Sequence, residues 1–92
     1  MKPLSNTKFY EMLARKNEEY KNNVAIENQV VVHIDSVNKM KGCSEVTYIK
    51  GNRTHKALVK TIELASAIVD GQICVSNISA LRGSDFSNIR YL

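Results

Sequence analysis

The spacing of apolar residues near the start of the chain predicts an amphipathic helix over residues 6–21. The apolar residues recur at steps of three, four and seven positions, on one helical face: Phe9, Met12, Leu13 and Tyr20. A stripe of this kind is more typical of a core face than of a groove for a partner. We therefore expect the helix to pack against the rest of the domain.

Two strands are predicted next, because apolar and polar residues alternate over residues 29–37 and again over 44–50. The first strand has Val30, Val32 and Ile34 on one face, with His33 and Asp35 on the other. Residues 38–42 separate the two segments and read as a basic turn. The short link predicts that the two strands pair as a hairpin.

A second helix is predicted to begin at Arg53 or Thr54 and to end at Val69. Gly51 and Asn52 interrupt the preceding strand, since both residue types tolerate positive φ. The expected buried stripe follows at helical spacing: Leu58, Ile62, Ala65 and Val69.

The remaining chain predicts a third strand at Ile73 and Val75, reaching as far as Ile78, then a loop over residues 81–85 and an edge strand over 87–92. The order is helix, strand, strand, helix, strand and a further strand. This pattern predicts one α+β domain over residues 1–92, a small sandwich with helices packed on one antiparallel or mixed sheet.

Composition indicates a folded protein and limits where in the cell it is expected. Hydrophobic residues make up 43% and charged residues 24% of the 92 positions, which is typical of globular domains. The longest apolar run, Val30 to Val32, is far too short to cross a bilayer, and the N-terminus has no apolar stretch of signal-peptide length. We expect a cytoplasmic protein with no membrane partner.

The distribution of charge is more informative than the net charge of +4. Residues 36–60 carry six bases and a single acid, Glu45, whereas bases and acids cancel over residues 1–35. A solvated lysine-rich face is common, but clustering in one segment is also typical of polyanion binding. The six bases are Lys39, Lys41, Lys50, Arg53, Lys56 and Lys60.

The densest part of this segment is residues 50–56, where a strand is predicted to lead through a turn into a helix. A helix N-terminus has unpaired N–H groups and partial positive charge, so the backbone near Thr54 is a candidate phosphate donor site, with His55 beside it. A true phosphate loop needs further glycines and a Lys-Ser/Thr pair, which the segment lacks.

The same segment resembles the second half of Alba-type nucleic-acid-binding proteins. A strand over residues 45–49 leads through Gly51-Asn52-Arg53 into residues 57–64, a pattern similar to that family's Gly-Arg turn and following helix, and Ile73 to Ile78 resembles its next strand. The resemblance covers about residues 44–83. It implies nucleic-acid binding, with Lys39 and Lys41 in a lysine-bearing loop and Arg82 near a basic hairpin tip.

The order of elements also resembles that of double-stranded-RNA-binding domains, which begin with a helix, continue with strands and reach a basic helix start. The sequence predicts no third strand ahead of Arg53 and has no lysine cluster like that of this family.

Candidate chemistry is sparse. His33, Cys43, His55 and Cys74 lie at irregular separations, so we expect no metal and no cofactor. His33 and Asp35 lie two positions apart on the polar face of a strand, without a nucleophile beside them. We expect no catalytic residues and no enzyme, with a small ribonuclease using His33 or His55 as the third alternative.

The first hypothesis is therefore a non-enzymatic protein that binds the phosphate backbone of DNA or RNA with little sequence specificity. Tyr48 is the one aromatic residue within the basic segment. The candidate contacts are Lys39, Lys41, Lys50, Arg53, Thr54, His55, Lys56, Lys60 and Arg82.

The second hypothesis is an inhibitor or adaptor of phage type that binds a host protein. Nine asparagines, one proline and no tryptophan suit an AT-rich genome, such as that of many phages. Its interface would be the helix carrying Phe9, Tyr10 and Met12, or an edge strand near Tyr91. The sheet edges are also compatible with a homodimer.

Overall fold

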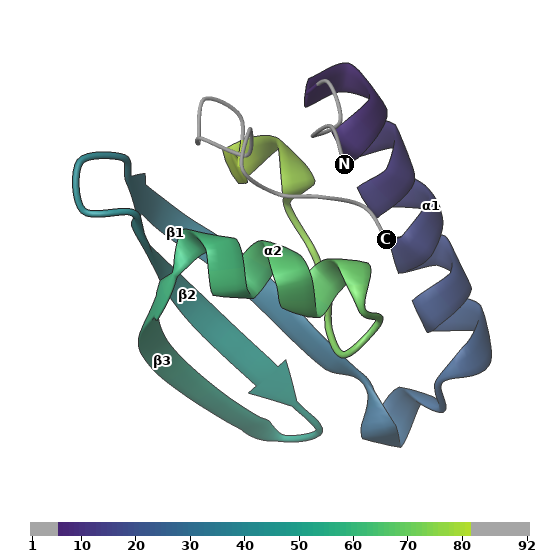
Figure 1. The fold of residues 1–92 in the computed structure, drawn as a ribbon. Coiled ribbons are helices and arrows are strands. Elements are labelled where there is room, and N and C mark those ends of the chain that lie inside the picture. The colour runs from purple at the N-terminus through teal and green to yellow at the C-terminus, as the bar shows by residue number, and fades with distance from the viewer. Residues whose placement is uncertain (1–5, 82–92) are drawn as a thin grey trace.

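The computed structural model describes residues 6–81, with side chains from Lys8 onward. Two α-helices and the strands between them form the bulk of the fold (Figure 1). The elements in chain order are α1 (Asn6–Asn23), the 3-10 turn η1 (Ile26–Asn28), β1 (Val30–Asn38), β2 (Cys43–Lys50), β3 (Arg53–Lys60), α2 (Thr61–Val69), β4 (Cys74–Val75) and the 3-10 turn η2 (Ile78–Leu81).

The strands of residues 6–81 form one mixed sheet in the order β3-β2-β1-β4. β1, β2 and β3 are antiparallel neighbours, and β4 pairs in parallel with β1. The link between β2 and β3 is only Gly51 and Asn52, and Gly51 has a φ of 59°, as the first position of a tight hairpin turn requires. The expected α+β class is confirmed.

Both helices contribute to a core on one face of the sheet. α2 crosses the sheet, and α1 lies beside α2 and β4 (Figure 1). The core side chains from the sheet include Val32, Ile34 and Val46, whereas the alternate residues His33 and Glu45 are exposed. The sheet therefore has one covered and one open face, which is common for antiparallel sheets. The helices contribute Phe9, Met12, Leu13, Leu64, Ala65 and Ile68.

The predicted start of the second helix is wrong. Arg53–Lys60 forms β3, and the helix begins at Thr61. Ala57 and Val59 are half-buried while Leu58 is 68% exposed, so this segment follows the two-residue period of a strand. The order is therefore helix, three strands, helix and strand, with a third antiparallel strand ahead of the second helix.

Other predicted elements agree with the structure or fall outside it. α1, β1 and β2 match their predicted segments within one or two residues. The predicted third strand is reduced to Cys74–Val75, because Ile78 lies in η2. The edge strand predicted over residues 87–92 and most of the loop over 81–85 lie outside the described residues.

The apolar stripe of α1 is core. Phe9 is 2% and Met12 5% exposed, and both pack in the main cluster. Phe9 and Met12 are therefore occupied by core packing, whereas Tyr10, the third residue named for a partner interface on this helix, is half-buried. No helix within residues 6–81 has both the length and the hydropathy needed to span a membrane.

Candidate nucleic-acid interface

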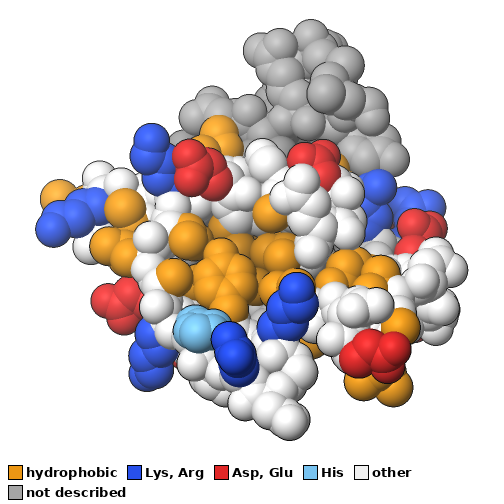
Figure 2. Space-filling view, turned by 90° about the horizontal axis from the view of Figure 1, so that it is seen from below, with side chains coloured by type: hydrophobic (Ala, Val, Ile, Leu, Met, Phe, Trp, Pro, Cys, Tyr) orange, Lys and Arg blue, Asp and Glu red, His pale blue; other side chains and the backbone are white. Residues whose placement is uncertain are grey.

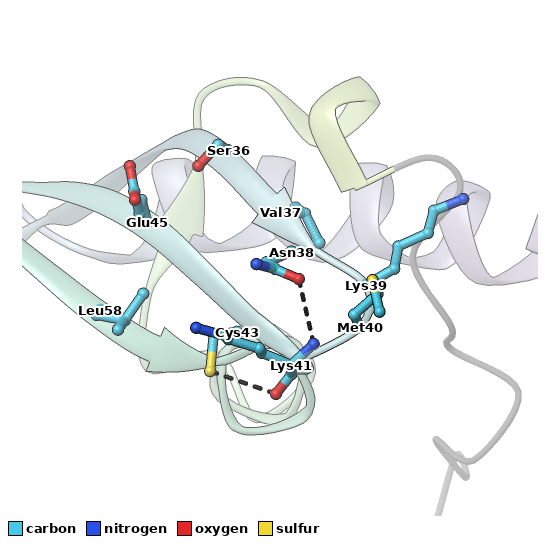
Figure 3. Close-up of a pocket in the computed structure, with 9 residues that line it drawn as sticks. All are labelled: Ser36, Val37, Asn38, Lys39, Met40, Lys41, Cys43, Glu45 and Leu58. Carbon is cyan, nitrogen blue, oxygen red and sulfur yellow. Dashed lines mark hydrogen bonds between the residues drawn. The ribbon is translucent and has the colours of Figure 1, made fainter.

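Three bases meet at the end of the sheet where β1 turns into β2. Lys39 and Lys41 lie in that turn, and Lys60, the last residue of β3, pairs with Cys43 at the start of β2. The Thr61 N–H donates to the Gly42 carbonyl over 2.8 Å, which places the N-terminus of α2 at the same end. Figure 3 shows Lys39 extending away from this turn.

The opposite end of the hairpin carries two further bases. Lys50 and Arg53 flank the turn between β2 and β3 and are directly paired across the strands. Lys56 lies between the two ends and pairs with Thr47. Since a strand rises about 3.3 Å per residue, β3 separates the two ends by roughly 23 Å.

These bases lie on the outer strand β3 and beside the turns at its two ends, with Lys50 and Arg53 on the helix-covered face and Lys56 and Lys60 on the open face. We call this set the basic edge: Lys39, Lys41, Lys50, Arg53, Lys56 and Lys60. All of these residues are exposed. Neither β3 nor the two turns contains an acid. The nearest acid in sequence is Glu63 in the first turn of α2, and Glu45 lies on β2 opposite Leu58. Within residues 6–81 the ion pair found is His33–Asp35, which involves none of these bases.

The structure changes the role of Thr54 and His55. Thr54 lies within β3 opposite Ile49, so the predicted helix N-terminus near Thr54 does not exist. The prediction failed because Leu58 and Ile62 happen to have helical spacing although both are exposed, Ile62 by 46%. His55 pairs with Tyr48 on the helix-covered side of the sheet. Arg82 lies outside the described residues.

Half-buried apolar side chains lie next to the bases at the hairpin end. Tyr48 is half-buried beside His55, and burial raises the pKa of its phenol. Figure 2 views the molecule from this end and shows a hydrophobic area with Lys or Arg side chains and a histidine around it. An aromatic ring beside lysine and arginine side chains is a surface on which a nucleobase can stack.

A shallow hollow of about 490 Å³ lies at the other end, beneath the β1–β2 turn (Figure 3). Its lining includes Lys39, Lys41, Cys43, Glu45 and Leu58. The half-buried Cys43 Sγ donates to the Lys41 carbonyl over 3.4 Å, which holds the turn. The hollow thus combines two cations, one carboxylate and several apolar side chains.

A second polar group lies on the open face of the sheet. His33 Nδ1 lies 3.1 Å from Ser76 Oγ, and His33 Nε2 lies 3.8 Å from Asp35 Oδ1. Asp35 Oδ2 accepts a hydrogen bond of 2.7 Å from the Thr47 hydroxyl. Sequence reasoning missed Ser76, because its contact with His33 depends on the parallel pairing of β4 with β1 and has no local signal.

This group has the residue types of a hydrolytic triad but lacks the burial and the short hydrogen bonds of one. The His33 side chain is 51% exposed, and its separation from Asp35 exceeds a hydrogen bond. A nucleophile needs a base that is itself held by a close partner. The arrangement is a surface network that links β1, β2 and the segment after β4. Within residues 6–81 no three His, Cys, Asp or Glu side chains group as metal ligands.

No family model, no curated protein and no solved structure matches this chain.

Proposed function

We propose that the protein binds nucleic acid through the phosphate backbone, using the basic edge. The observation that carries the proposal is the placement of six exposed bases on one edge strand and on the turns at both of its ends. No acid lies on this strand or in these turns, and no ion pair among the described residues involves these bases. The bases therefore keep their full charge for an external anion.

The chemistry of the basic edge favours binding without sequence readout. Five of its six members are lysines, which interact with phosphate as compact point charges and lack the planar fork of arginine. The N-terminus of α2 lies near Lys39, Lys41 and Lys60, and Glu63 in its first turn offsets part of its partial positive charge. Affinity then comes mainly from the release of counterions from the nucleic acid.

Duplex RNA is the first polymer to test. A helix, three antiparallel strands and a second helix follow one another in this chain, which resembles the order of elements in double-stranded-RNA-binding domains. Such domains contact duplex RNA mostly through its shape, phosphates and 2′-hydroxyls. This order of elements supports RNA over DNA as the preferred polymer in the proposal.

The decisive experiment titrates the purified protein against labelled duplex RNA, duplex DNA and single strands at about 50 and 200 mM salt. If six phosphates are contacted, the slope of log affinity against log salt is about −5, and affinity falls about a thousandfold between these conditions. Absence of binding to every polymer at 50 mM salt would overturn the proposal.

Charge-matched variants separate the basic edge from net charge. Lys39→Gln/Lys41→Gln and Arg53→Gln/Lys56→Gln each remove two members of the edge, so each reduces the slope by about 2. The control, Arg15→Gln/Lys21→Gln, removes two exposed charges from α1. An equal loss of slope in the control would contradict the assignment to this edge.

A further inference from the structure

β3 is the outer strand of the sheet, and its backbone is open to pairing. The order β3-β2-β1-β4 leaves one side of β3 without a neighbour among residues 6–81. Figure 1 shows β3 along the margin of the molecule, with α2 over the face of the sheet and not along this margin. A strand with an unpaired side can accept another extended chain through main-chain hydrogen bonds.

The register shows which residues offer these groups. Thr61 N–H donates to the Gly42 carbonyl, which continues the ladder between β2 and β3 beyond Lys60. Because antiparallel residues alternate between facing their neighbour and facing away, Val59, Ala57 and the alternate residues before them pair with β2. The outward N–H and C=O groups therefore belong to Thr54, Lys56, Leu58 and Lys60.

The side chains of these same residues lie on the open face of the sheet. All are exposed, and Leu58 has 68% of its surface in solvent. Hollows lie on both sides of Leu58, one bordered by Lys56 and Asp35 and the other by Cys43 and Lys41. Along the strand the pattern is base, apolar, base at every second residue, from Lys56 through Leu58 to Lys60.

We propose that the β3 edge binds an extended acidic segment of a protein partner as an added strand. Its carboxylates pair with Lys56 and Lys60, and an apolar side chain between them contacts Leu58. The partner segment therefore has the pattern acid, any residue, apolar, any residue, acid. This inference shares Lys56 and Lys60 with the basic edge but does not rest on nucleic-acid binding, because it also needs the outward backbone groups and Leu58, which phosphates do not require.

The charges on β3 select this occupant over a second copy of the chain. A second β3 brings Arg53, Lys56 and Lys60 with no acid, and like charges on neighbouring strands are destabilising. Glu45 is one strand further in, so an added strand lies about 10 Å from it, near the screening length at physiological salt. The attraction of the acidic segment to Lys56 and Lys60 therefore outweighs its repulsion by Glu45.

The test uses a labelled seven-residue peptide, Thr-Glu-Thr-Val-Thr-Glu-Thr, in fluorescence anisotropy titrations with the full chain. Two matched peptides serve as controls: one has the same composition with both glutamates adjacent, and one is N-methylated at alternate residues to remove backbone donors. We expect the patterned peptide to bind at least tenfold more tightly than either control. Hydrogen exchange should slow at the amides of Lys56, Leu58 and Lys60.

Two variants at one exposed position complete the test. Leu58→Pro removes one outward N–H and is compatible with an edge strand, and Leu58→Thr removes the apolar contact without changing charge. Both variants should lower the affinity for the patterned peptide at least tenfold, while Leu58→Thr leaves nucleic-acid affinity unchanged. Equal binding of the three peptides, no binding at 1 mM peptide, or a dimer through β3 in sedimentation would each overturn the proposal.

Discussion

The side chain of Asn17 on α1 pairs with the backbone of Val75 in β4 as a neighbouring strand would. Its Nδ2 donates to the Val75 carbonyl over 3.0 Å, and its Oδ1 accepts from the Val75 N–H over 3.2 Å. Asn17 is only 6% exposed. β4 has two residues and pairs with β1 on its other side, so this one amide satisfies the outer side of the strand.

A second asparagine extends the pairing where β4 ends. The Asn77 Nδ2 donates to the Ile34 carbonyl over 2.7 Å, and the Ile34 N–H donates to the Asn77 Oδ1 over 2.8 Å. Ile34 precedes the irregularity in the pairing of β1 with β2. Side-chain amides therefore replace strand hydrogen bonds on both sides of the shortest strand.

Replacing Asn17 with alanine should destabilise the protein by about 2–4 kcal/mol, since it leaves a buried N–H and a buried carbonyl of Val75 without partners. Urea unfolding followed by circular dichroism measures this change. Asn22→Ala, at an exposed position of the same helix, is the matched control and should change stability by less than about 0.5 kcal/mol. Equal stabilities of the two variants would contradict the role given to Asn17.

Local patterns predict most of this fold but not β3. The stripe of α1 and the alternation of β1 are predicted correctly because the apolar period holds over most of each segment. In residues 53–60, Leu58 continues a helical spacing with Ile62 and Ala65, whereas Ala57 and Val59 alternate as in a strand. The segment forms a strand instead of a helix because Ala57 and Val59 pack against the core, which is a tertiary effect.

The basic edge is predicted in its composition but not in its shape. The sequence shows that Lys39 through Lys60 concentrate the charge, because this requires only counting. The strand assignment then changes the geometry: Arg53 pairs with Lys50, and Lys60 lies beside the turn that carries Lys41. The contact of His33 with Ser76 had no signal at all, since it joins residues 43 positions apart.

The hydroxyls of Ser44 and Thr61 form a buried pair that joins β2 to the start of α2. Their oxygens lie 2.7 Å apart, with Ser44 0% and Thr61 6% exposed. Ser44→Ala or Thr61→Val alone should cost about 1–2 kcal/mol, because each leaves the other hydroxyl unpaired. The double variant should cost no more than the worse single variant. Urea unfolding of all three gives the coupling energy, and strict additivity would show that the two hydroxyls do not interact.

The two cysteines should differ sharply in reactivity. Cys43 is half-buried at the edge of a surface hollow, whereas Cys74 is 0% exposed. Both are free thiols. A thiol-specific reagent should therefore modify Cys43 rapidly and Cys74 only when the protein unfolds. The measurement is the number of thiols per chain that react in the fast phase in the native protein. In Cys43→Ala this fast phase should disappear. Two fast equivalents in the unaltered protein would contradict the burial of Cys74.

The same burial predicts that the protein loses stability at alkaline pH. Burial raises the pKa of Cys74 above its ordinary value of 9.0, and it also raises the pKa of Tyr48 above 10.0. The folded state therefore keeps a proton that the unfolded state releases, so the free energy of unfolding is constant below about pH 9 and falls as pH rises toward the folded-state pKa. The fall is at most about 1.4 kcal/mol per pH unit for each group. Urea unfolding in reductant between pH 7 and 10.5 measures it. In Cys74→Ala the free energy of unfolding should begin to fall about one pH unit higher, because only Tyr48 then contributes. If the fall began at the same pH as in the unaltered protein, groups other than Cys74 would cause it.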